Sequence, residues 1–137
     1  RTVQTLSSHD AQTLVATALA ELVARGAVGV VAVVDNHGEL LAFVRMDGAP
    51  FPSTTIAINK AYSAARTRKP TRDIGKKVRS ADQGFDIAYY GDSRIVGWGG
   101  GMPVMVDGVC VGAVSVSGLT EDEDAEIAAG AIAKLLA

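Results

Sequence analysis

The fold is decided by one stretch of sequence, GGGMPVMVDGVCVGAVSVSGLTEDE, which spans residues 99–123. Within it, Asp107-Gly108 separates two extended runs that are rich in valine. This dipeptide supplies the positive φ values that a two-residue hairpin turn needs. We therefore predict an antiparallel hairpin made of Pro103–Val106 and Val109–Ser117.

The residues just before this hairpin are candidates for the wall of a binding site. Gly99, Gly100 and Gly101 lack Cβ atoms, so a ligand or a second backbone segment can approach them closely, and successive amides there can face an anion. A tight bend between strands is the structural alternative. Trp98 can stack on a flat ligand or fill the edge of the core.

A helix is predicted directly after the hairpin. Thr120 and Glu123 fit the capping box Thr-x-x-Glu, in which each side chain satisfies the other residue's free backbone amide. The acidic run 121–126 resembles a metal-binding cluster, but carboxylates also favour the positive end of a helix dipole. We therefore interpret the run as structural. The buried stripe of this helix is expected to contain Ala128, Ala131, Ile132 and Leu135.

The first half of the chain contains further helices and a second hairpin. Ser7 or Ser8, Ser53 and Thr71 are the predicted helix caps. Residues 80–95 carry only a weak pattern and are expected to be irregular. The order of elements predicts an α/β (α+β) domain in which helices cover an antiparallel sheet. The predicted elements are a helix that begins at the Ser7 or Ser8 cap and stops at Gly26, strands over 27–34 and 39–46, and helices over 54–67 and 71–79.

Length and composition narrow the class of protein. With 137 residues, the chain has room for one domain, 1–137. A net charge of -2 and 5% aromatic residues argue against nucleic acid as a partner, and no apolar run nears the roughly 18 residues of a membrane span. The 48% hydrophobic content suggests more apolar surface than a monomer can bury, which predicts a homo-oligomer. Because residues 1–8 do not resemble a signal peptide, we expect a cytoplasmic protein.

Two cations near the predicted sheet edge can bind an acidic ligand. Arg45 ends an apolar run and precedes a loop, where its guanidinium can clamp a carboxylate bidentately. Lys60 lies on the helix expected to cover that edge, with Tyr62 on the same helix and Thr71 just after it. Pairing of Arg45 or Lys60 with an acid such as Asp47 is the structural alternative.

Few side chains are suited to metal ligation or nucleophilic catalysis. His9 lies at a helix start and His37 in a turn, a spacing that matches no HExxH-type motif, and His9 is the candidate metal ligand. Cys110 lies in an apolar strand, which favours a buried core residue over a thiolate nucleophile. Tyr90 and Asp92, in the irregular segment, can supply acid or base groups to a lid.

Several segments, spread in order over nearly the whole chain, form a recognisable set. They are Val33-Val34-Asp35 with Gly38, Arg45-Met46-Asp47-Gly48-Ala49, Asn59-Lys60-Ala61, Gly99 through Val104, Asp107-Gly108, Gly112-Ala113, Val116-Ser117-Gly118 and Glu121-Asp122-Glu123. Together they resemble the GlcG-like or HbpS-like haem-binding family, which is also similar to the C-terminal domain of PduO-type cobalamin adenosyltransferases.

The resemblance implies a profilin-like, three-layer α/β/α fold with a five-stranded antiparallel sheet, assembled into homo-oligomers. It also implies a role in haem handling or redox sensing for some members, and a place in catabolic pathways for others. Two alternatives remain open: a small catabolic enzyme that acts on a carboxylated or heterocyclic substrate at the same pocket, and a protein whose apolar face serves only assembly. In the haem reading, Thr71 or His9 would lie nearest the iron. The predicted ligand-binding residues are Arg45, Lys60, Tyr62, Thr71, Trp98, Gly99, Gly100 and Gly101.

Overall fold

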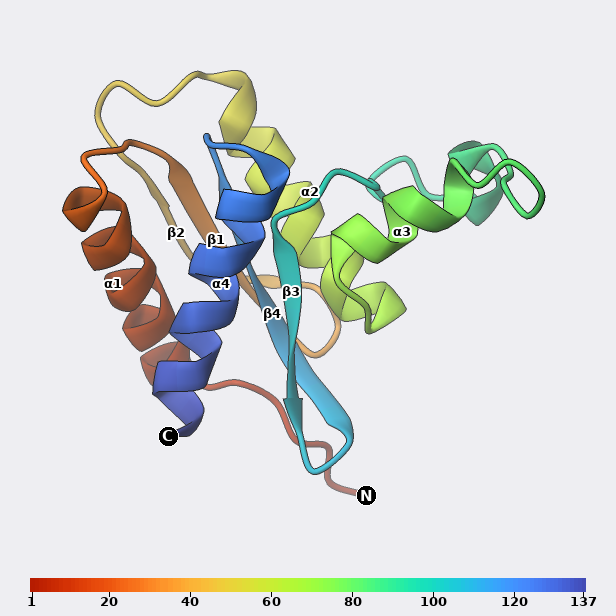
Figure 1. Cartoon of the computed structure of the whole chain (residues 1–137). Helices are drawn as coiled ribbons and strands as arrows, with labels where there is room; N and C mark the ends of the chain where they lie inside the picture. The colour runs from red at the N-terminus through yellow and green to blue at the C-terminus, as the bar shows by residue number, and fades with distance from the viewer.

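The structure is a computed structural model that describes all of residues 1–137. Its elements follow the predicted order, with an additional 3-10 turn, η1, inside the segment expected to be irregular (Figure 1). The elements are α1 (Ser8–Ala24), β1 (Val30–Asp35), β2 (Leu40–Arg45), α2 (Pro52–Thr67), α3 (Thr71–Val78), η1 (Ile87–Tyr90), β3 (Gly101–Val106), β4 (Val109–Ser117) and α4 (Glu121–Leu136).

The sheet has four strands in the order β2-β1-β4-β3, and every neighbouring pair is antiparallel. Val30 pairs with Arg45 on one side and with Ser117 on the other, which makes β1 a central strand. The five strands implied by the family resemblance are therefore wrong. The run before β3 stays irregular because it bonds elsewhere: Val96 N donates to the Ser63 hydroxyl, and Gly99 N to the Glu121 carboxylate.

Helices cover both faces of the sheet, so the chain forms three layers. Figure 1 shows α1 and α4 side by side on one face and α2 on the other. Valines of β1 and β4, such as Val31 and Val114, face α1 and α4, whereas Ala32 and Ala113 face α2. Alanines dominate this second layer on both sides, and their small size lets α2 pack closely on the sheet. None of the helices combines the length and the hydropathy that a membrane span needs.

The helix caps agree only in part with the sequence. Ser7 caps α1 in a reciprocal capping box with Asp10, and the Thr120 hydroxyl accepts from Glu123 N at the start of α4. The cap predicted at Ser53 is wrong, because α2 begins at Pro52 and has no side-chain cap. The cap predicted at Thr71 is also wrong: this residue lies inside α3, and its hydroxyl is used elsewhere.

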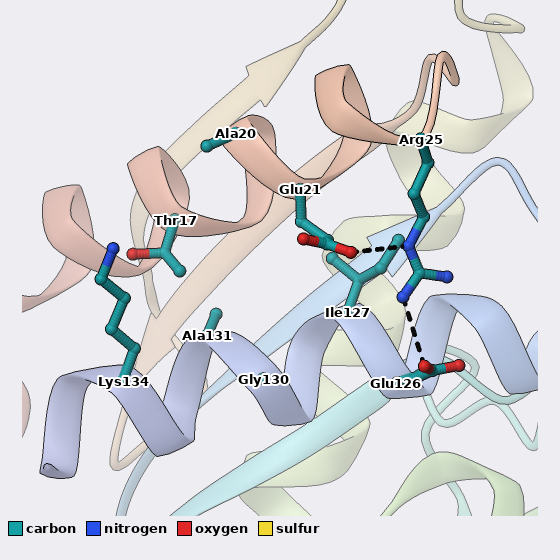
Figure 2. A pocket seen from close by; sticks show the side chains of 9 residues that line it. All are labelled: Thr17, Ala20, Glu21, Arg25, Glu126, Ile127, Gly130, Ala131 and Lys134. Carbon is teal, nitrogen blue, oxygen red and sulfur yellow. Dashed lines mark hydrogen bonds and ion pairs between the residues drawn. The ribbon is translucent and has the colours of Figure 1, made fainter.

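A groove runs between α1 and α4 on the outer face of their layer (Figure 2). At one end Arg25 bridges the two helices, with its guanidinium 2.9 Å from Glu21 Oε1 and 3.3 Å from Glu126 Oε1. Ile127 and Ala131 form the base of the groove. The ion pairs are exposed to solvent and therefore contribute little stability.

Candidate functional site

The glycine segment, Gly99–Gly101, lies where α2, α3 and α4 meet the start of β3. Lys60 reaches this point from the face of the sheet that α2 covers, and Asp124 of α4 reaches it from the opposite face. Their charged atoms lie 3.3 Å apart, and each residue is only 2% exposed. The Lys60 ammonium also donates to Val116 O at 3.1 Å. A buried ion pair therefore stands directly behind the glycine segment.

The glycines are required because side chains and backbone occupy the space that Cβ atoms would need. A Cβ on Gly100 would lie 2.7 Å from Lys60 Nζ, and Gly100 also has a φ of +129°, which other residues avoid. A Cβ on Gly101 would lie 2.5 Å from Lys60 O. The amide of Gly101 donates to Thr71 Oγ1 at 3.0 Å. These glycines thus serve close packing of protein against protein.

Burial sets the electrostatics of the ion pair. Desolvation lowers the pKa of Lys60 below its ordinary 10.5, although the nearby Asp124 carboxylate opposes this shift. Desolvation also raises the pKa of Asp124 above 3.8, against the effect of the Lys60 charge and of the Leu119 amide that donates to it. Each residue therefore depends on the other to remain charged inside the protein.

The acidic residues at the start of α4 have a structural role, as predicted. They form specific contacts in addition to the expected interaction with the helix dipole. Glu121 accepts from Gly99 N at 2.8 Å, Asp122 pairs with Arg72 of α3, and Asp124 pairs with Lys60. The run thus fastens α4 to the glycine segment, α3 and α2. No group of three or more His, Cys, Asp or Glu residues in the chain could hold a metal ion.

An open groove of about 790 Å³ lies on the α3 side of the glycine segment. Trp98 forms one wall and is 58% exposed, and Arg79 and Glu121 stand among the lining residues. The Lys60 ammonium lies 6.0 Å from the centre of the Trp98 ring, so the buried ion pair stands behind this wall. The apolar lining consists of Val78, Phe85, Ile87, Ile95, Val96 and Trp98. We call this depression the Trp98 groove.

The structure brings together six of the eight predicted ligand-binding residues: Lys60, Thr71, Trp98 and the three glycines. Arg45 is separate, because it is at the end of the edge strand β2 and its guanidinium lies 5.2 Å from the centre of the exposed Phe51 ring. It forms no ion pair with Asp47, which was the structural alternative. Tyr62 faces a different cavity, described below.

His9 is exposed in the first turn of α1, on the sheet face opposite to α2. Its role as a metal ligand stays a prediction. Cys110 is buried, as predicted.

Two residues of the site, Asp124 and Arg79, were not predicted from the sequence. Asp124 belongs to an acidic run that the helix dipole already explained, so nothing in the sequence distinguished it from its neighbours. Arg79 follows α3 and lines the Trp98 groove. Its position at the end of a basic helix gave no sign of a groove, because the opposite wall comes from residues 85–98.

The model of the family described as "Haem degrading protein HbpS-like" matches residues 6–133. An uncharacterised 15.0 kDa protein of Citrobacter freundii, encoded between dhaT and dhaS, is 39% identical over 75% of this chain and 72% of its own length. GlcG of Escherichia coli is 37% identical over 64% of this chain and 62% of its own. The corrinoid adenosyltransferase PduO of Salmonella typhimurium is 28% identical over 95% of this chain, which spans only 39% of that longer protein.

Solved structures agree with this assignment. The protein ORFY of Klebsiella pneumoniae superposes with a TM-score of 0.92 at 33% identity, over 100% of this chain and 94% of its own. A complex of PduOC with haem superposes with a TM-score of 0.85 at 29% identity, over 94% of each chain. The predicted resemblance is confirmed, and the chain belongs to the HbpS-like family.

Proposed function

We propose that this chain binds haem, or a similar flat carboxylated ligand, in the Trp98 groove. The observation that carries the proposal is the groove itself: an open, mainly apolar depression beside an exposed tryptophan, in a chain whose relative PduOC forms a complex with haem. Exposed tryptophan on a small domain costs free energy in water, and a flat aromatic ligand would relieve that cost.

The groove fits the macrocycle and its carboxylates. Its volume of about 790 Å³ and its apolar lining suit a flat ring system with one face against Trp98. Arg79 is exposed in the lining and forms no ion pair, so it is free to meet a propionate. Lys60 cannot do so as predicted, because its ammonium is buried against Asp124.

The iron of haem finds no ordinary ligand in this lining. None of the residues that line the groove is His, Cys, Met or Tyr, the usual axial ligands. We therefore propose that contacts between the lining and the macrocycle would provide most of the affinity. In this proposal His9 can ligate iron only from a second copy of the chain in a homo-oligomer, since α1 covers the other face of the sheet.

Comparing haemin with iron-free protoporphyrin IX tests the proposal. Trp98 is the only tryptophan, so its fluorescence reports directly on the groove. We expect haemin to bind one per chain with a shifted Soret band, and both compounds to quench Trp98 with affinities within about threefold, because iron ligation adds little.

Variants locate the site. Trp98→Ala should weaken haemin binding about tenfold, equivalent to ~1.4 kcal/mol of lost ring contact. Arg79→Gln should weaken it about threefold, while the control Arg68→Gln, which removes a charge outside the groove, should change nothing. The proposal is wrong if haemin does not bind stoichiometrically, or if His9→Ala abolishes binding and Trp98→Ala leaves it intact.

A further inference from the structure

A second cavity, of about 380 Å³, lies at the C-terminal end of α2. One wall comes from the last turns of α2 and the residues that follow, and the other from residues 90–95. The backbone of this second segment is fastened to α2, because Ser63 Oγ donates to Arg94 O at 3.0 Å and accepts from Val96 N at 2.9 Å. The cavity shares only Ile95 with the Trp98 groove. It is therefore a separate site with ordered walls.

Tyr62 forms the base of this cavity and is held rigidly. It is 3% exposed, and its hydroxyl donates to Asp92. The same Tyr62 hydroxyl oxygen accepts a hydrogen bond from Arg94 Nη2 at 2.7 Å. The Arg94 guanidinium also lies 3.9 Å from the centre of the Tyr62 ring. Asp92 and Arg94 form an ion pair and so balance each other's charge. Asp92 stays ionised because hydrogen bonds from the Tyr62 hydroxyl and the Arg94 amide lower its pKa to about 2.

The remaining charges of the lining are positive and uncompensated. Arg66 lies over the Tyr62 ring at 5.1 Å but forms no ion pair, and Lys69 also forms none. The negative end of the α2 dipole stabilises Arg66, which explains why a cation lies in the last turn of the helix. The dipole does not explain why two unpaired cations line one cavity. The lining is completed by a hydroxyl, an aromatic ring and an apolar side chain, those of Thr67, Tyr90 and Ile95. The site therefore offers positive charge next to an apolar floor.

We infer that this cavity binds a small oxyanionic metabolite, a carboxylate or phosphate ester with a short flat or apolar body. The anion would lie between Arg66 and Lys69, the two unpaired cations that line the cavity, and the body would lie against Tyr62 and Tyr90. The chain as a whole carries a net charge of -2, so this local excess of positive charge is not a general property of its surface. The inference does not depend on haem binding.

The inference is tested by titrating the isotopically labelled full chain with three matched compounds at physiological salt. Benzoate and phenyl phosphate carry the two kinds of oxyanion, and benzamide is the neutral control. We expect saturable amide shifts around Tyr62 and Arg66 with a Kd of about 1 mM for at least one anion, and no saturation with benzamide. Stronger binding of benzoate would identify a carboxylate site, and stronger binding of phenyl phosphate a phosphate site.

Matched charge changes decide whether the cavity is responsible. Arg66→Gln with Lys69→Gln should weaken binding of the anion at least tenfold, whereas Arg68→Gln removes a neighbouring charge outside the cavity and should alter the Kd less than twofold. Trp98→Ala should have no effect, which separates this site from the haem proposal. Equal losses in the double variant and in Arg68→Gln, or no saturation with either anion, would overturn the inference.

Discussion

Replacing Lys60 by Met tests the buried ion pair behind the glycine segment. Methionine has a similar length and an apolar end, so the variant fills the same space but leaves the Asp124 carboxylate without its cation. Removing one partner of a buried pair typically costs about 3–5 kcal/mol, because the remaining charge stays desolvated. We expect a loss of this size in the free energy of unfolding at pH 7.

The loss should depend strongly on pH, and its sign follows from Asp124. Burial already raises the pKa of this carboxyl above 3.8, and loss of the Lys60 charge raises it further. A folded-state pKa above the unfolded value means that the folded protein binds the proton more tightly, so the variant gains stability as pH falls. Each pH unit between the unfolded and folded pKa is equivalent to about 1.4 kcal/mol. Near pH 4 the variant should therefore approach the wild type.

Urea unfolding at pH 4.5 and pH 7.5 measures both effects. The matched control is Arg25→Met, which breaks the exposed ion pairs with Glu21 and Glu126 and should change the free energy of unfolding far less than Lys60→Met does, at either pH. Adding Asp124→Asn to Lys60→Met removes the charge but keeps an acceptor for the Leu119 amide, and it should restore most of the lost stability. A pH-independent loss, or no recovery in the double variant, would refute the electrostatic explanation.

Three further predictions concern packing and local charge. Gly101→Ala places a Cβ 2.5 Å from a backbone oxygen of α2 and should lower the free energy of unfolding by about 1–3 kcal/mol. Gly130 lies within α4, where a Cβ would meet no other atom, so Gly130→Ala should raise the free energy of unfolding by about 0.5–1 kcal/mol. Thermal melts measure both changes. Tyr62→Phe removes the main cause of the low Asp92 pKa of about 2, so the midpoint of that carboxyl in a ¹³C NMR titration should move upward. Cys110 should react with a thiol reagent only after unfolding, because it is buried, and rapid labelling of the folded chain would contradict this.

The elements of the fold could be predicted because their signals are local. The turn at Asp107-Gly108 requires positive φ, and both residues adopt it, with φ of +49° and +77°. The apolar run that became β1 is buried along nearly its whole length, as a central strand requires. The helix caps predicted at Ser53 and Thr71 were wrong. A serine or threonine before a helix suggests a cap, but Pro52 and Pro70 already set the start of α2 and α3.

The site was only partly predictable because its contacts join residues far apart in the chain. Lys60 and Asp124 are 64 residues apart, and no local pattern shows that two charged side chains on different helices will be buried together. Arg45 was expected beside Lys60 at one edge of the sheet, but Arg45 ends β2 and Lys60 meets β4, so β1 separates the two residues. Its role as a carboxylate clamp stays a prediction.

The position of Trp98 links the buried pair to the proposed binding groove. Trp98 lies between two anchored neighbours in the chain. The amide of Gly99 donates to the Glu121 carboxylate, and Gly97 packs closely on α3. Glu121 and Asp124 belong to the same first turn of α4, so the ion pair that fixes Asp124 also fixes the carboxylate that holds the tryptophan wall. A glycine segment is needed here because any side chain would push these partners apart. The residues that decide the shape of the groove therefore include some that never line it.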